Sequence, residues 1–307
     1  MTILMKFFVT ESFWFTVLRC ITPILFATCA SLVANISGVY FLGVEGCMTV
    51  AALCGVLGSG FSGSLFLGML CGMVSGTLYS LLQAYCVLRL RAQTIITGIA
   101  LNLAAAGGSE FLLYTLTGDK NASNSLPSLV FPVVNIPLIE DIPVVGNILS
   151  GHNVLTYLSF IAAICVFIMM KHTRFGIKLR AVGEMPAAAE SVGIKVDGVR
   201  YKALFISGIL ASFGGMYLSM GYIHRFTTGM VAGRGYISLA TEAMTGGNAL
   251  MGILSSFLYA FGNSISIHLQ NFGFDPYLIT IVPYVFIIVF YIIFSLARKL
   301  REKDGKA

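Results

Sequence analysis

Charged residues are scarce in this chain of 307 residues. Asp, Glu, Lys and Arg make up 10% of it, whereas hydrophobic residues make up 57% and the mean hydropathy is +0.88. A soluble domain carries about 25% charged residues, so the composition excludes a single water-soluble fold. The hydrophobic residues gather in runs of about 20 residues, the length with which a helix crosses the hydrocarbon core of a bilayer.

Motifs for nucleotide, metal or catalytic chemistry are absent as well. The chain has no G-x-x-x-x-G-K-[ST] loop to cradle phosphate, no H-E-x-x-H, no Cys-x-x-Cys pair and no G-x-S-x-G nucleophile elbow. We therefore expect no catalytic residue, no metal site and no cofactor bound by this chain. If the chain is part of an active transporter, a separate ATPase would have to bind ATP and Mg²⁺.

The clearest apolar runs predict the membrane spans. They cover approximately residues 12–34, 41–60, 61–88, 94–116, 154–171, 203–222, 236–270 and 276–297. The run 236–270 is long enough to cross twice, or to dip in and return, with a turn at Gly246-Gly247-Asn248. The predicted fold class is therefore an all-α integral membrane protein. We expect one domain over 1–307, a polytopic bundle of about 8–10 transmembrane helices with broken or re-entrant segments.

The placement of the basic residues predicts the orientation. Of the 19 Lys and Arg residues, 14 lie in three short segments, at 89–91, 171–202 and 298–306. Cytoplasmic loops carry such an excess, so we expect a cytoplasmic loop at 172–202, a cytoplasmic tail at 298–307 and no nucleic-acid partner. The linker 117–153 holds one Lys, three acidic residues and four prolines. We expect it to lie outside, as a cap on the membrane surface that cannot be one helix.

The segment 172–202 contains a short helix with clear ends. Pro186 suits the first turn of a helix and Gly193 suits its end. Between them lies the sequence AAAESV, in which strong helix formers prevail. A rigid element held between two spans by glycine joints is suited to insert into a groove of a partner.

The stretch from Gly176 to Ile194 closely resembles the coupling loop of permease subunits of ABC importers, in the simple-sugar and nucleoside branch related to the branched-chain amino acid permeases. That loop runs roughly G-x-x-L-R-A-V-G-x-N-P-x-A-A-x-x-x-G-I. The matching residues are Gly176, Leu179, Arg180, Ala181, Val182, Gly183, Pro186, Ala188, Ala189, Gly193 and Ile194, and Met185 stands where the family usually has Asn. Weaker matches follow in family order at 35–46, 97–102, 232–240 and 276–284.

The resemblance implies a type II ABC importer-like fold and a permease subunit that forms the pathway for a nucleoside or a simple sugar. It implies a separate ATPase, a second permease subunit in a homo- or heterodimer, an extracellular substrate-binding lipoprotein and the plasma membrane of a bacterium. The residues expected to couple to the ATPase are Gly176, Arg180, Gly183, Glu184, Pro186, Ala188, Ala189, Gly193 and Ile194. Bulky residues at Gly183, Ala188 or Gly193 would then abolish transport without abolishing membrane insertion.

Polar residues inside the apolar runs are candidates for lining a pathway, because ionisable groups in a membrane are costly and usually functional. The candidates are Asn35, Glu45, Asn102, Glu242 and Asn263. The alternative is structural: carboxylates bonded to backbone or to a helix N-terminus, and amides in interhelical hydrogen bonds. Gln83, Glu110 and His268 also lie in or near these runs.

A stripe of small residues at every fourth position predicts a close helix contact. It consists of Gly60, Ser64, Gly68, Gly72, Gly76 and Ser80.

Two other functions stay open from the residues alone. A self-sufficient secondary transporter or channel for a small polar solute would need a strong ion relay in the membrane, and few carboxylates are visible. An intramembrane enzyme would need a catalytic constellation, and none is evident.

Overall fold

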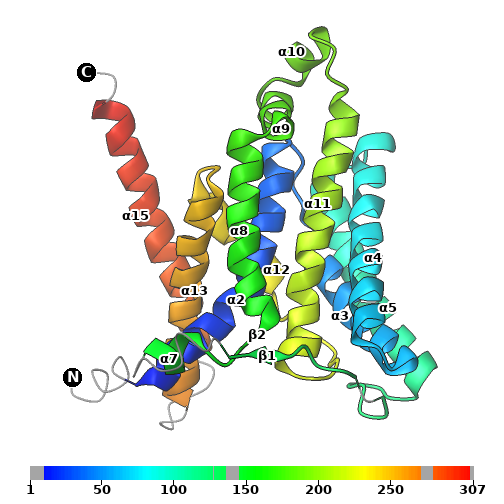
Figure 1. Cartoon of the computed structure of the whole chain (residues 1–307). Coiled ribbons are helices and arrows are strands. Elements are labelled where there is room, and N and C mark those ends of the chain that lie inside the picture. The colour runs from blue at the N-terminus through cyan, green and yellow to red at the C-terminus, as the bar shows by residue number, and fades with distance from the viewer. Residues whose placement is uncertain (1–9, 127, 136–144, 271–278, 305–307) are drawn as a thin grey trace.

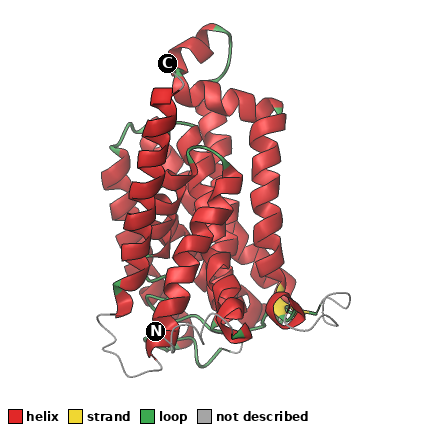
Figure 2. Cartoon of the chain, turned by 90° about the vertical axis from the view of Figure 1, so that its left-hand side faces the viewer, coloured by secondary structure: helices red, strands yellow, loops and turns green. Residues whose placement is uncertain are grey.

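The computed structural model describes residues 10–126, 128–135, 145–270 and 279–304, which form a bundle of long helices (Figures 1 and 2). The long helices are α2 (Glu11–Ile36), α3 (Val44–Ser62), α4 (Leu65–Ala84), α5 (Thr94–Thr117), α8 (Val154–His172), α11 (Val196–Met216), α13 (Ala249–Gln270) and α15 (Val282–Asp304). Two π-helical turns, η1 (Tyr85–Arg89) and η2 (Tyr217–Tyr222), continue α4 and α11. The short elements are α7 (Val145–Leu149), α9 (Arg174–Glu184), α10 (Pro186–Ser191), α12 (Arg234–Thr245) and the strands β1 (Val133–Val134) and β2 (His152–Asn153).

Seven of the described helices are long and apolar enough to span a membrane, and α15 contains a shorter apolar stretch, Val282–Leu296. The predicted polytopic helical fold is therefore confirmed. The run 236–270 contains one short helix and one full-length helix, α12 and α13. With 12 residues, α12 is about 18 Å long, which is too short for a hydrocarbon core of about 30 Å. The predicted turn joins the two helices, and Gly246 and Gly247 both have positive φ.

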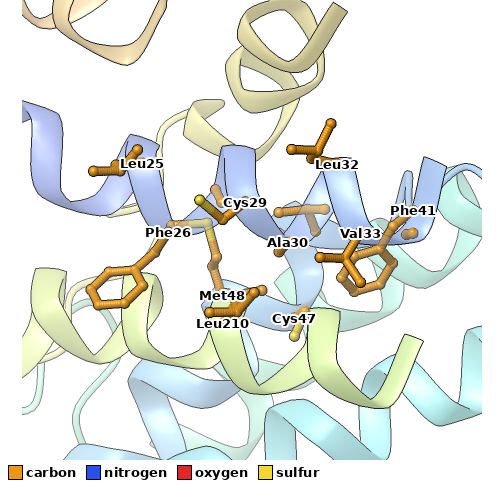
Figure 3. Packing of buried hydrophobic residues seen from close by; sticks show 14 of the residues in the cluster. Leu25, Phe26, Cys29, Ala30, Leu32, Val33, Phe41, Cys47, Met48 and Leu210 are labelled. Carbon is orange, nitrogen blue, oxygen red and sulfur yellow. The ribbon is translucent and has the colours of Figure 1, made fainter. Parts of the chain in front are cut away.

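The core is built around α2, which packs against α8, α11, α12 and α13. Figure 3 shows part of this core, where Phe26, Cys29 and Ala30 of α2 lie beside Met48 of α3 and Leu210 of α11. These side chains are buried, which explains why α2 is apolar around its whole circumference rather than along one stripe.

The small-residue stripe lies in the contact of α4 with α3 and α11, as the spacing predicts. A Cβ at Gly72 would lie 2.9 Å from the backbone oxygen of Ala51, so any larger residue would push α4 away from α3. Farther along the stripe, the Ser80 hydroxyl donates to the Leu204 carbonyl of α11 at 2.5 Å. The opposite side of α4 exposes large apolar side chains, including Phe66 and Leu78.

The two ends of the bundle differ. One end, called the loop end, carries α9 and α10, and the last described residues of α15 lie at the same end (Figure 1). The other end, called the linker end, carries β1, β2 and α7. The linker 117–153 is not one helix, as predicted: β1 and β2 pair antiparallel, and Ala122 forms a bridge with Thr227.

The C-terminal helix continues beyond the predicted span. The last apolar run is predicted to end at residue 297 before a tail at 298–307, and α15 continues without a break to Asp304, so the described part of that tail is helical. Lys and Arg are good helix formers, so the change from apolar to charged residues does not end a helix. The cytoplasmic location of the tail stays a prediction. The resemblance at Pro276 and Tyr277 lies outside the described residues.

Candidate coupling loop and polar cluster

The loop between α8 and α11 is more helical than the sequence analysis predicted. Helix α9 begins after Thr173, whose hydroxyl accepts a hydrogen bond from the Gly176 N–H at 3.2 Å, as an N-cap residue does. Its buried residues Gly176, Leu179 and Val182 recur every third position. That spacing was a usable helix signal, but the charged residues between them led us to treat the segment as a polar connection.

Helix α10 is the predicted short helix. Pro186 occupies its first position, and the helix ends at Ser191, before Gly193 with φ +83°. The Gly193 N–H donates to the Glu190 carbonyl at 2.9 Å, and the Ile194 N–H donates to the Ala189 carbonyl at 3.0 Å. These bonds close the helix end with a left-handed residue, which glycine adopts without strain.

The expected coupling residues divide into an exposed and an interior set. Arg180, Glu184, Ala188 and Gly193 are exposed; Gly183, Pro186 and Ile194 are half-buried; Gly176 and Ala189 are buried. The exposed residues can contact a partner, while the buried ones shape the loop.

Two large apolar side chains beside α10 were not among the candidates. Met185 is 69% exposed and Val192 is 74% exposed, one before and one after the helix. The signal for Met185 was its departure from the family pattern, which we noted only as the loss of an Asn.

The loop is joined tightly to the rest of the bundle. A Cβ at Gly183 would collide with the Ile36 carbonyl oxygen, so α9 lies directly on the end of α2. The Arg200 guanidinium donates to the Ser37 carbonyl at 3.2 Å. A displacement of α9 must therefore also move the end of α2.

The side chain of Glu45, a residue of α3, lies against the start of α12. Its two carboxylate oxygens accept hydrogen bonds from the Gly233 N–H at 2.8 Å and the Gly235 N–H at 2.7 Å. The first N–H groups of a helix have no partner within the helix and form its positive end, so Glu45 caps α12 from α3. Gly235 is needed here, because a Cβ would lie 2.5 Å from the Glu45 backbone nitrogen.

Asn102 of α5 joins the same cluster. Its amide oxygen accepts from the Gly46 N–H at 2.8 Å, and its amide nitrogen donates to the Leu42 carbonyl at 2.9 Å and the Tyr236 hydroxyl at 2.8 Å. Through these three hydrogen bonds, the Asn102 side chain connects α5, the start of α3 and the first turn of α12.

The rest of α12 is bonded to α2. The Asn35 amide donates to a Glu242 carboxylate oxygen at 2.8 Å, and the hydroxyls of Thr28 and Thr241 lie 2.6 Å apart. Ser31 and Ser238 form a further hydroxyl pair at 3.2 Å. Side-chain hydrogen bonds between helices replace water as partners inside a membrane.

Four of the five pathway candidates, Asn35, Glu45, Asn102 and Glu242, thus lie in contacts that hold α12. Asn263 of α13 lies elsewhere and donates to the Cys20 sulfur at 3.3 Å. These bonds are those of the structural alternative, and the lining of a pathway by these residues stays a prediction. Among the described residues, no group of three or more His, Cys, Asp or Glu could hold a metal ion.

Glu110 was noted in the sequence but was not made a candidate. It is exposed on α5, about two turns before the end of that helix, and hydrogen-bonds or ion-pairs with none of the described residues. Its neighbours on the same exposed side include Leu103 and Phe111, which are 70% and 68% exposed. Gly107 and Gly108 have open space where a side chain would stand.

Comparisons with known proteins agree with the arrangement of this bundle. The family "Branched-chain amino acid transport system / permease component" matches residues 13–296. The nucleoside ABC transporter permease protein NupC of Lactococcus lactis subsp. cremoris (strain MG1363) is 32% identical over 255 residues, 80% of this chain and 79% of the relative. The guanosine ABC transporter permease protein NupQ of Bacillus subtilis (strain 168) is 30% identical over 253 residues, 80% of this chain and 78% of the relative.

A solved structure shows the same fold. The structure described as "An inward-facing conformation of a putative metal-chelate type ABC transporter" superposes with a TM-score of 0.51 at 15% identity, covering 91% of this chain and 85% of that chain. The match spans nearly all of the bundle and shows that the two chains share a fold. The chain belongs to the family "Branched-chain amino acid transport system / permease component".

Proposed function

We propose that the chain is the permease subunit of an ABC importer for nucleosides, driven by a separate ATPase that docks on the loop end. The two relatives that are at least 30% identical are named for nucleoside and guanosine transport, and each is matched along 80% of this chain. In this proposal ATP and Mg²⁺ are bound by the ATPase, and an extracellular lipoprotein delivers the nucleoside.

The observation that carries the docking proposal is the exposed apolar surface around α10. Met185 and Val192 flank the exposed Ala188, in a loop that is otherwise rich in charge. Large apolar side chains exposed to water mark contact surfaces. Because the neighbouring residues are alanines, the surface is smooth enough to fit a groove closely.

The loop also has the connections that a lever needs. An inward push on α10 passes to α9, and Gly183 of α9 lies against Ile36 at the end of α2. Since α2 packs on α8, α11, α12 and α13, the push acts on the centre of the bundle. We propose that closure of the ATPases rocks these helices between inward-open and outward-open states.

Glu110 supports a second permease subunit beside α5. A carboxylate exposed to lipid is unfavourable, by about 3 kcal/mol at the centre of a spanning helix on insertion scales and by less towards its ends. A second permease with a water-filled pathway between the two subunits would remove that cost. The open space at Gly107 and Gly108 would allow the backbones to approach closely.

The orientation follows from the same arrangement. The loop end carries the basic segment 171–202 and must face the compartment that supplies ATP, so we place it on the cytoplasmic side of a bacterial plasma membrane. The described end of α15 lies at this end, which supports a cytoplasmic C-terminus. The linker end then faces the delivering lipoprotein.

The test is capture of the ATPase by variants of α10. We expect Ala188→Trp to be inserted and folded but to lose both ATPase co-purification and guanosine uptake into vesicles, because the new ring fills the docking surface. Ala188→Ser keeps the surface small and should behave as wild type, as should Lys120→Trp, a bulky change at the linker end. Normal ATPase capture by Ala188→Trp would refute the docking, as would uptake by vesicles that contain no ATPase. If an excess of a simple sugar suppressed uptake and an excess of a nucleoside did not, the proposal of a nucleoside substrate would be refuted.

A further inference from the structure

A hollow lies at the loop end between α9 and the beginning of α11. Its volume is about 640 Å³, within the range of small-molecule sites. Four cationic side chains line it: Arg174 and Lys178, one turn apart on α9, Lys195 just before α11, and Lys202 on α11. Apolar side chains, among them Phe175 and Ile194, complete the lining.

No acidic side chain lines this hollow. The nearby acids Glu190 and Asp197 line an adjoining hollow, which shares Lys195 with it, so the cations away from both acids are Arg174, Lys178 and Lys202. Within the described ranges, none of the four cations forms an ion pair or a hydrogen bond with another side chain. A concave site with charges of one sign attracts a counter-ion.

In the orientation proposed above, we expect the hollow at the depth of lipid headgroups. Lys202 is the last charged residue of α11 before the apolar stretch from 203 to 222, so its position marks the boundary between water and hydrocarbon. The other three cations come earlier in the chain: Arg174 and Lys178 belong to α9, and Lys195 directly precedes α11. Apolar lining next to cations matches a ligand that has a charged head and an apolar remainder.

We propose that this hollow binds the headgroup of an anionic phospholipid from the inner leaflet. The phosphodiester would lie among Arg174, Lys178 and Lys202, and the glycerol and the start of the acyl chains would lie against Phe175 and Ile194. Basic pockets at this level of a membrane protein recognise anionic lipid heads. The proposal rests on the orientation given under the proposed function, with the loop end at the cytoplasmic leaflet.

An acidic surface of the ATPase is a less suitable occupant. The residues of α10 itself, Pro186–Ser191, do not line the hollow, although Val192 and Gly193, which follow α10, do. The cations come instead from α9 and from the first two turns of α11, the segments nearest to the bilayer. A bound lipid would connect α9 to α11 and so tie the loop to the membrane, and it would lie beside Val192 at the edge of the docking surface.

The test compares two variants that lose the same number of charges at the loop end. Lys178→Gln/Lys202→Gln removes two cations of the hollow, whereas Arg89→Gln/Lys171→Gln removes two exposed cations outside it. The full chain in phosphatidylcholine nanodiscs is titrated with phosphatidylglycerol, and bound lipid is counted by native mass spectrometry. Each cation near an anionic surface changes binding by about fivefold, so the hollow variant should bind about 25-fold more weakly and the control variant within about twofold of wild type.

Three results would overturn the proposal. Equal losses in both variants would show a general attraction of the loop end for anionic membranes. Displacement of the bound lipid by millimolar glycerol phosphate in solution would show a site for soluble phosphates. The third result is that the hollow variant binds phosphatidylglycerol as the wild type does but no longer captures the ATPase in pure phosphatidylcholine. That result would show that the hollow serves the ATPase. If lipid binding fails while Ala188→Trp still blocks ATPase capture, only the lipid proposal falls and the proposed function stands.

Discussion

The hydrogen bonds between Glu45 and α12 make a prediction that can be worked out in energy. The Glu45 carboxylate accepts from two backbone N–H groups, at 2.8 and 2.7 Å, at the start of a helix that does not cross the membrane. A hydrogen bond to a charged group contributes about 1.5–3 kcal/mol. Glu45→Gln keeps one acceptor oxygen and turns a donor toward the second N–H, so it should cost about 2 kcal/mol. Glu45→Ala removes both acceptors and should cost about 4 kcal/mol.

The assay is thermal unfolding of the purified permease in one detergent. A change of 1 kcal/mol shifts the unfolding temperature of a large domain by about 2 °C, so we expect decreases of about 4 °C for Glu45→Gln and about 8 °C for Glu45→Ala. Glu110→Gln is the matched control, since Glu110 is exposed and bonds to none of the described residues. If Glu45→Gln unfolds at the wild-type temperature, the carboxyl is protonated and is not a double acceptor. A decrease for Glu110→Gln as large as that for Glu45→Gln would show that the loss does not come from the cap of α12.

Three further predictions concern the two ends of the bundle. Gly183→Val should lower folding stability by about 2–3 kcal/mol, because the new side chain meets the Ile36 carbonyl. Gel filtration should show less folded protein for this variant than for Ala188→Trp. A normal elution profile for Gly183→Val would contradict the contact between α9 and α2. Asn35→Leu removes the partner of Glu242 and should reduce transport while ATPase capture stays normal; unchanged uptake would contradict this role. Burial lowers the pKa of His152 below its usual 6.5. Its unfolded form binds the proton more readily, so stability should fall as the pH drops below about 6.5 and should depend less on pH in His152→Gln.

The sequence predicted the helices well wherever one physical requirement decided the structure. A backbone inside a bilayer must satisfy its own hydrogen bonds, so apolar runs such as 94–116 and 154–171 became α5 and α8 with ends shifted by a residue or two. Pro186 and Gly193 delimited α10 for a similar reason, since proline is favoured in the first turn of a helix and glycine favours positive φ. Each of these signals is local, and no distant residue competes with it.

The polar residues show where prediction from the sequence ended. That Asn35, Glu45 and Glu242 needed partners followed from their position in apolar runs. Their partners did not follow, because Glu45 bonds to backbone groups almost 190 residues later in the chain. No spacing rule relates such positions, and only packing of α12 between α2, α3 and α5 brings them together. α9 was missed for a different reason, because its apolar residues are few and two of its inward positions are glycines.

The contacts of α2 connect the loop end with the polar cluster. Three consecutive residues at its end make these contacts: Asn35 contacts α12, Ile36 contacts α9, and Ser37, the residue after α2, contacts α11. The short helix α12 is in turn held at its other end by Glu45 and Asn102, which belong to α3 and α5. A push on the loop can therefore reach α5, the helix with the exposed Glu110, through contacts that are all hydrogen bonds or close backbone packing. Contiguity alone does not show coupling, and this is why Asn35→Leu is informative: it breaks one bond in that series and leaves both the docking surface and Glu110 untouched.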